Sequence, residues 1–168
     1  ANIFSGLSET DTPKAYRAMI DSVLATDMAR HADTMQRYAE LVANGFDVND
    51  ATDRAVILKM IIKAADISNV TKPFEISRMW AMSVTEEFYQ QGDKEKAKGV
   101  AVLPMFDRMA GTELAKGQIG FIQFLGLKFY SSVAEEGGLF PGLAWTVANV
   151  RANLAKWQAL LVPPAPVT

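Results

Sequence analysis

The sequence predicts an all-α protein, folded as a compact multi-helix bundle. Apolar residues recur at three- and four-residue steps along most of the 168-residue chain. No stretch shows the alternation of apolar and polar residues that is typical of strands. Residues that begin or end helices fall between the periodic stretches. With 49% hydrophobic residues the chain has enough apolar material for a core. We expect one helical unit over residues 1–162, followed by a proline-rich tail over residues 163–168.

The first helical stretch is predicted to begin near Asp11, because a capping residue there precedes Pro13 in the first turn. Its apolar stripe continues through the following residues without an evident stop. Asn44 and Gly45 end it, since glycine is the usual residue just after a helix. The sequence therefore predicts helix over most of residues 11–44.

The next two helices are delimited by capping residues and by proline. Either Asn49 or Asp50 is suited to cap the second helix, which then runs to about Ala65. Pro73 follows a loop and opens the third helix, in which apolar residues are spaced as on one face. This helix is predicted to end at Gly92, where the apolar spacing stops.

The last part of the chain predicts a short segment and two further helices. Pro104 begins the short segment, and a long apolar helix is expected from Glu113 to about Ser132. Pro141 precedes a final helix that ends near Leu161.

The composition excludes several classes of function. The chain has no cysteine, so it holds no disulfide, thiolate metal site or cysteine nucleophile. Its 17 basic and 19 acidic residues give no overall charge for binding nucleic acid or an anionic membrane. No apolar run reaches the about 18 residues of a membrane span, and we expect a cytoplasmic protein. His31, the one histidine, lacks a G-x-S-x-G partner and is interpreted as a partly exposed helix residue.

One charged run, EEFYQQGDKEKAKG, closes the third predicted helix. Its carboxylates are Glu86, Glu87, Asp93 and Glu95, the last two interleaved with lysines. The simplest interpretation is a solvated helix end with ion pairs along it.

Asp66 stands at the end of an apolar helical run and is followed by Ser68 and Asn69. Such residues are common in turns and helix caps, which is one interpretation. The other is that Asp66 binds a metal ion and Asn69 binds a ligand.

Gln118 and Phe121 lie three residues apart and therefore share a helix face. An amide beside an aromatic ring suits a flat heterocycle, which needs hydrogen bonds at its edge and stacking on its face. Gly117 and Gly120 flank the pair and are expected to permit a close approach. The alternative is a plain core helix with small residues at a packing contact.

Five motifs in a fixed order carry a resemblance to a known family. They are ATDMARH, IIKAADISNVTKPFEISRMW, TEEFYQQGDKEKAKG, LPMFDR and GQIGFI. Together they resemble the second half, the C-terminal subdomains, of the catalytic domain of class I cyclic-nucleotide phosphodiesterases. The resemblance implies an all-helical fold and hydrolysis of the 3′ phosphoester bond of cAMP or cGMP by a metal-bound hydroxide. It implies zinc and magnesium as the cofactors of the complete domain.

Roles carried over from the family fall on individual residues of this sequence. Asp66 matches a metal ligand. The residues that match the walls of the nucleotide pocket are Asn69, Gln118, Phe121, Val84, Met28 and Met105. Among them, Asn69 and Gln118 correspond to contacts with the base, and Phe121 and Val84 to the two sides of a hydrophobic clamp. By resemblance, Asn69 favours cAMP as substrate.

The chain also departs from the family pattern. The family's metal site needs two histidines and another aspartate, and its general acid is a further histidine; all belong to motifs that this sequence lacks. Gln123 stands where the family usually has aspartate. We therefore expect weak metal binding and no hydrolysis by the isolated chain, with activity requiring a companion N-terminal half. The alternative is a truncated or redesigned, non-catalytic helical scaffold that forms a homo-oligomer or binds a partner.

Overall fold

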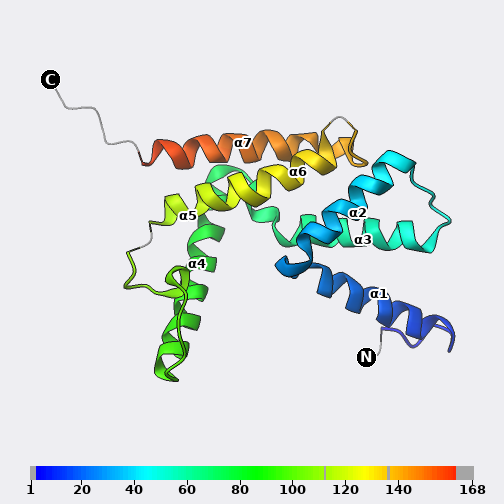
Figure 1. Ribbon diagram of the computed structural model, residues 1–168, viewed down its shortest axis with the longest axis horizontal. Helices are drawn as coiled ribbons and strands as arrows, with labels where there is room; N and C mark the ends of the chain where they lie inside the picture. Colours follow the sequence, from blue (N-terminus) through cyan, green and yellow to red (C-terminus); the bar gives the residue numbers. More distant parts are fainter. Residues whose placement is uncertain (1–2, 112, 136, 162–168) are drawn as a thin grey trace. The chain divides into compact units, whose positions relative to one another are not determined.

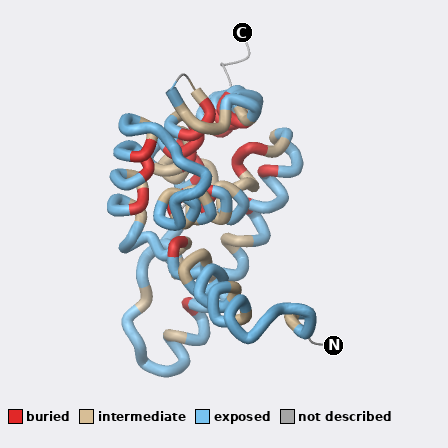
Figure 2. The backbone as a smooth tube through the Cα atoms, turned by 90° about the vertical axis from the view of Figure 1, so that its right-hand side faces the viewer, coloured by how far each residue is buried: buried red, intermediate tan, exposed pale blue. Residues whose placement is uncertain are grey.

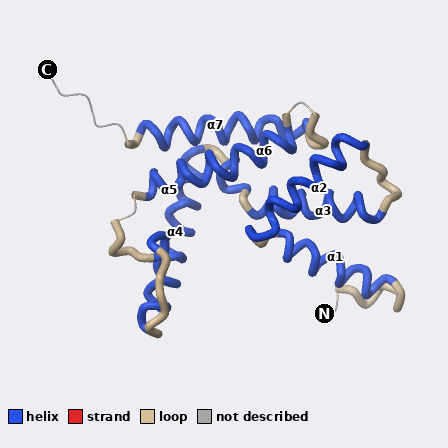
Figure 3. The backbone as a smooth tube through the Cα atoms, viewed as in Figure 1, coloured by secondary structure: helices blue, strands red, loops and turns tan. Residues whose placement is uncertain are grey.

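The computed structural model describes residues 3–111, 113–135 and 137–161, and this part of the chain contains helices and no strand (Figure 3). The predicted all-α fold is thereby confirmed. The chain divides into two compact units, Ala1–Ile67 and Ser68–Thr168. Two compact units can belong to one domain, so the single unit over residues 1–162 stays a prediction. The tail over residues 163–168 lies outside the described residues.

In its described residues, the first unit contains three α-helices and one short 3-10 helix, drawn from blue to cyan in Figure 1. They are α1 (Asp11–Ala25), η1 (Met28–Arg30), α2 (His31–Asn44) and α3 (Ala51–Asp66). Helix α3 packs against both α1 and α2. The buried apolar side chains of the unit are Ala25, Tyr38, Leu41, Val56 and Met60.

The helix predicted over most of residues 11–44 is interrupted at Thr26 and Asp27. Asp27 adopts an extended conformation with ψ 124°, and its Oδ1 accepts a hydrogen bond of 2.9 Å from the Ala29 N–H. Thr26 donates its hydroxyl hydrogen to the Val23 carbonyl. The Asp27 side chain bonds to the backbone of the next turn, which gives the chain an alternative to continuous helix. The helix is therefore interrupted here, although the apolar spacing continues.

The remaining ends of helices in the first unit follow local capping rules. Gly45 has a φ of 91°, a conformation that favours glycine, and α2 ends at Asn44 as predicted. Asp50, rather than Asn49, is the cap of α3, because its carboxylate accepts from the N–H groups of Thr52 and Asp53. Asp66 is the last residue of α3, at the predicted position.

The part of the second unit that the structure describes contains four α-helices together with short helical segments. In chain order they are η2 (Ser68–Thr71), α4 (Phe74–Ala97), η3 (Pro104–Phe106), α5 (Leu114–Phe121), the π-helix η4 (Ile122–Gly126), α6 (Leu127–Ala134), η5 (Pro141–Leu143) and α7 (Ala144–Ala159). Helices α6 and α7 lie side by side (Figure 1), and α7 also contacts α4, α5 and η2. Buried residues recur along these helices between exposed ones, as expected of helices with one covered face (Figure 2).

Helix α4 does not end at Gly92, as the sequence predicted, but continues to Ala97. A Cβ at position 92 would overlap the Phe106 carbonyl oxygen. Nearby, the rings of Phe88 and Phe106 meet edge to face with centroids 5.1 Å apart. Gly92 therefore permits the backbone of η3 to approach α4, and it does not stop the helix.

The long apolar helix predicted from Glu113 to Ser132 is present as a continuous helical run, but its middle is irregular. The π-helix η4 separates α5 from α6. Gly126 closes this stretch and is buried, and a Cβ there would lie 3.4 Å from Val70 Cγ2. A π-helical turn is uncommon and often occurs near a functional site.

Candidate functional site

Most of the predicted site residues lie on helix α4 or on elements that contact it. It carries Val84 and contacts η2, which holds Asn69, and η3, which holds Met105. It also contacts α5, which carries Gln118 and Phe121. These five residues thus lie on elements of one compact unit that pack around a single helix. That their side chains line one pocket stays a prediction.

Gln118 is a buried side chain with a polar atom that has no hydrogen-bond partner among the described residues. Its side chain is buried, with 9% exposed, yet no group in the described part of the chain donates a hydrogen bond to its Oε1. Leaving a buried acceptor without a donor costs about 1–3 kcal/mol. Phe121, one turn later, is half-buried. Gln118 therefore presents a buried acceptor that has no donor among the described residues.

The glycines beside Gln118 lie on an open face of α5 in the described part of the chain. A Cβ added at Gly117 or at Gly120 would meet no atom within 4 Å. Within the described residues this face of α5 is therefore open at both glycines, and the close approach of a ligand stays a prediction. Among the glycines of the second unit, an added Cβ would meet other atoms at Gly92, Gly126 and Gly138.

Asn69 lies in a segment that is held by hydrogen bonds from a distant helix. The Asn153 Nδ2 group donates to the carbonyls of Val70 and Lys72, both at 2.8 Å, and the Asn149 Nδ2 group donates to the Thr71 carbonyl at 2.8 Å. The sequence analysis missed both asparagines. The available signal was their spacing of four residues on the last predicted helix, which puts two amides on one face.

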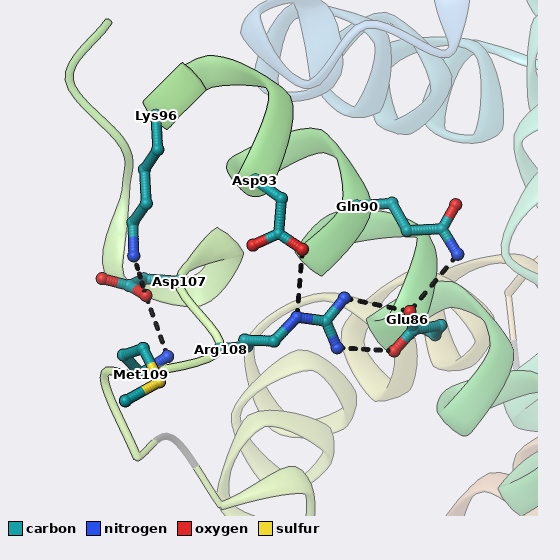
Figure 4. Close-up of polar contacts among 7 residues, drawn as sticks. All are labelled: Glu86, Gln90, Asp93, Lys96, Asp107, Arg108 and Met109. Carbon is teal, nitrogen blue, oxygen red and sulfur yellow. Dashed lines mark hydrogen bonds and ion pairs between the residues drawn. The ribbon is translucent and has the colours of Figure 1, made fainter. Parts of the chain in front are cut away.

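Met105 lies in η3, and a cluster of ion pairs holds the residues that follow it against α4 (Figure 4). Arg108 donates through Nη1 and Nη2 to the two carboxylate oxygens of Glu86, each at 3.0 Å, and through Nε to Asp93 at 3.1 Å. Lys96 pairs with Asp107. We call these five residues the ionic strap.

The ionic strap confirms that the charged run on α4 is ion-paired and shows which residues are the partners. Two of its carboxylates, Glu86 and Asp93, pair with Arg108 of the following loop, and Lys96 of the run pairs with Asp107. The side chains remain exposed, as expected. Hydrogen bonds from Arg108, and then from Gln90, hold the pKa of Glu86 below its usual value. Lys96 and the Met109 N–H do the same for the pKa of Asp107.

Two predicted site residues, Asp66 and Met28, belong to the first unit, and both are exposed. One turn before Asp66, the buried Lys63 donates from Nζ to the Ala25 carbonyl at 2.9 Å. Burial lowers the pKa of Lys63, while the charges of Asp66 and Asp27 oppose that shift. The cation thus holds the end of α1 next to the end of α3.

The described residues do not by themselves fit a zinc or magnesium centre. No three histidine, cysteine, aspartate or glutamate side chains in this part of the chain are grouped as metal ligands. Hydrolytic zinc sites normally use three protein ligands. Asp66 stays a predicted single ligand. His31 begins α2, and burial, followed by the charge of Lys63, lowers its pKa.

Comparison with known proteins agrees with the motifs. A family model described as 3′5′-cyclic nucleotide phosphodiesterase matches residues 1–150. The chain belongs to this family. The resemblance predicted from the sequence is thereby confirmed.

Individual relatives share this family and differ in the nucleotide that their names give. The human high affinity cGMP-specific 3′,5′-cyclic phosphodiesterase 9A is 37% identical over 140 residues, which are 83% of this chain and 23% of that protein. The probable 3′,5′-cyclic-AMP phosphodiesterase pde-4 of Caenorhabditis elegans is 32% identical over 174 residues, covering 99% of this chain and 25% of that protein. The chain therefore spans about a quarter of the length of these curated relatives.

A solved structure is similar over nearly the whole chain. The Leishmania phosphodiesterase LmjPDEB1, in complex with IBMX, is 58% identical, with a TM-score of 0.87. The match covers 94% of this chain and 47% of that one. None of the helices in the described residues is long and apolar enough to cross a membrane.

Proposed function

We propose that this chain carries the nucleotide pocket of a metal-dependent phosphodiesterase that hydrolyses 3′,5′-cyclic nucleotides to 5′-nucleotides, with cAMP preferred. The observation that carries the proposal is the buried Gln118 amide, whose Oε1 has no donor among the described residues. In a member of this family, a base edge is the partner that such an acceptor would serve. A donor on the base then offsets the cost of burying the oxygen.

The proposed roles follow from the chemistry of each side chain. Asn69 and Gln118 carry neutral amides that both donate and accept, which suits the edge of an uncharged purine. Phe121 and Val84 offer apolar surfaces for the two faces of the ring, and aromatic stacking contributes about 1–3 kcal/mol per base in other base-binding proteins. Met28 and Met105 are proposed to line the rest of the pocket, since a flexible thioether adapts to an irregular ligand.

Asn69 supports the preference for cAMP through the resemblance to the family. The names of the relatives do not agree on the nucleotide. Phosphodiesterase 9A is described as cGMP-specific, and pde-4 is described as a probable cyclic-AMP phosphodiesterase. The substrate preference therefore rests on Asn69 rather than on the relatives.

Asp66 is proposed to supply one metal ligand in the complete enzyme, where zinc and magnesium, when bound, would activate water and neutralise charge on the phosphoryl oxygens. One carboxylate does not hold a divalent ion tightly, and the chain has a single histidine. The isolated chain is therefore expected to bind divalent metal weakly and to show no turnover.

The pocket is tested in the full-length enzyme that contains this chain. Because Gln118→Ala removes the acceptor, we expect the KM for cAMP to rise about tenfold or more, with a smaller change in kcat. Gln158→Ala, an exposed amide of α7, is the matched control and should change neither. An unchanged KM in the Gln118→Ala enzyme would contradict the pocket assignment.

The metal assignment has a separate test. Purified isolated chain is incubated with cAMP or cGMP, zinc and magnesium, and release of 5′-nucleotide is followed. We expect none, whereas full-length enzyme should turn over and lose activity with Asp66→Ala. Turnover by the isolated chain that disappears in its Asp66→Ala variant would show that fewer ligands suffice.

One observation favours the second candidate, a non-catalytic scaffold that self-associates or binds a partner. Met79, Trp80 and Met82 of α4 are 68%, 58% and 51% exposed. A group of large apolar side chains on a surface favours association. Sedimentation of the isolated chain tests this candidate: concentration-dependent dimers that Trp80→Ser weakens would support it, and a strict monomer at high concentration would contradict it.

A further inference from the structure

We infer that Asn149 and Asn153 of α7 are positioning residues for Asn69: they fix the backbone that carries this amide, and thereby affect the choice between cyclic nucleotides. The inference rests on the proposed function. It concerns a contact between residues that are about eighty positions apart in the chain.

The first step is the geometry of the two amides. Three successive carbonyls, those of Val70, Thr71 and Lys72, all accept hydrogen bonds of 2.8 Å from the Nδ2 groups of Asn149 and Asn153. Asn69 directly precedes these carbonyls, and its own carbonyl accepts from the Lys72 N–H at 3.4 Å. Each of the three residues that follow Asn69 is therefore hydrogen-bonded to α7 through its carbonyl.

The second step is the burial of this attachment. Asn153 is 2% exposed, and the two residues that follow Asn69, Val70 and Thr71, are 0% and 2% exposed. Water does not replace a lost donor easily at such a place. On another side, the Val70 side chain lies next to Gly126, where an added Cβ would be 3.4 Å from the Val70 Cγ2. The backbone beside Asn69 is held from more than one direction.

The third step links position to selectivity. Asn69 is itself half-buried, so its amide depends on its backbone for placement. Hydrogen bonds to a base edge distinguish bases only when donor and acceptor are accurately placed. A misplacement of about 1 Å is sufficient to reduce rates about 100-fold in enzymes. If the turn is less firmly held, discrimination between the bases should therefore decrease more than the rate of the reaction at the phosphate.

The experiment compares variants of the full-length enzyme with cAMP and with cGMP as substrates. Asn149→Ala removes one hydrogen bond at a half-buried site, and Asn149→Asp keeps the shape but removes the donor. We expect both to raise the KM for the preferred nucleotide about fivefold and to lower the ratio of kcat/KM values between the two nucleotides, with kcat changed less than about twofold. Asn69→Ala should change the ratio in the same direction. The control Gln158→Ala should leave it unchanged.

Asn153→Ala is a further variant and should change the ratio in the same direction. If Asn153→Ala does not fold, the Asn149 variants still test the inference. An unchanged ratio in the Asn149 variants, or a fall in kcat alone, would overturn this inference while leaving the proposed function intact. Wild-type enzyme without turnover on either nucleotide would overturn the proposed function itself.

Discussion

The segments η2 and η3 each carry a residue of the proposed pocket, and each is attached to a long helix by different chemistry. Neutral amides of α7 hold η2, and the amide of Asn153 is buried. The ionic strap holds η3 against α4 at an exposed surface (Figure 4). A buried amide is hard to replace by water, whereas exposed ion pairs contribute little and are screened by salt. Asn69 is thus expected to be more rigidly held than Met105.

The largest effect is expected when the attachment of η2 is broken. Asn153→Ala leaves the carbonyls of Val70 and Lys72 without their donor, so the free energy of unfolding should fall by about 3 kcal/mol in urea denaturation. The fall should be the same at low and high NaCl, because no charged group is involved. Gln158→Ala serves as the control on the same helix. A loss below about 1 kcal/mol would mean that water takes over the amide's role.

The next effect tests how closely η3 approaches α4. Gly92→Ala places a Cβ against the Phe106 carbonyl, which should lower the free energy of unfolding by about 2 kcal/mol as the segment is displaced. Gly120→Ala is the matched control, because its Cβ enters open space and alanine favours helix by about 1 kcal/mol. Equal stability of the two variants in urea would contradict the close contact.

A smaller effect is expected from the ionic strap itself. Arg108→Ala should lower Tm by less than about 3 °C at low salt, and the difference should vanish in 1 M NaCl, where exposed charges are screened. Differential scanning calorimetry of both proteins at the two salt concentrations measures it. A loss that persists at high salt would show that Arg108 acts by packing, for example against Tyr89, rather than by charge.

The strap also predicts a dependence on pH. The pKa values of Glu86 and Asp107 lie below their usual values in the folded protein because of their bonded partners. The stability that they contribute is therefore present above the usual carboxyl range and is lost as the pH falls through the folded pKa values. The Arg108→Ala protein should lose less stability than wild type over the same acid range.

The smallest effect extends the comparison to a buried cation in the first unit. Lys63 lowers the pKa of His31, after the larger effect of burial, so Lys63→Met should raise that pKa. His31 is the one histidine of the chain, and its ring signals in an NMR titration are unambiguous. Lys59→Met is the control, one turn earlier on α3. If the pKa of His31 is unchanged in Lys63→Met, burial alone lowers it and the charge of Lys63 has no effect.

The lowered pKa of His31 also determines how the stability of the folded protein changes with pH. Since the folded pKa of His31 lies below the usual 6.5, the folded protein binds its proton less readily than the unfolded chain does. Stability is therefore retained above that value and decreases as the pH falls through the folded pKa.

The fold class and many helix ends were determined by the sequence alone. Periodic apolar residues predict helices, and Gly45 and Asp50 act within one or two residues of the ends that they set. The family was recognisable for the same reason, because its motifs are short and their order is preserved. The predicted pocket residues of the second unit lie on elements that pack around α4, although their individual roles stay predictions.

Other features were decided only by the tertiary structure. Nothing next to Gly92 in the sequence indicates that Phe106 crosses it, so a residue that usually ends helices was misread. The partners of Asn149, Asn153 and Arg108 likewise lie on other elements. Capping and periodicity depend on neighbours within a few residues, whereas a close approach or a long-range hydrogen bond depends on which segments the folded core brings together. The sequence therefore determined the helices, and their packing decided how the segments of the candidate site are held.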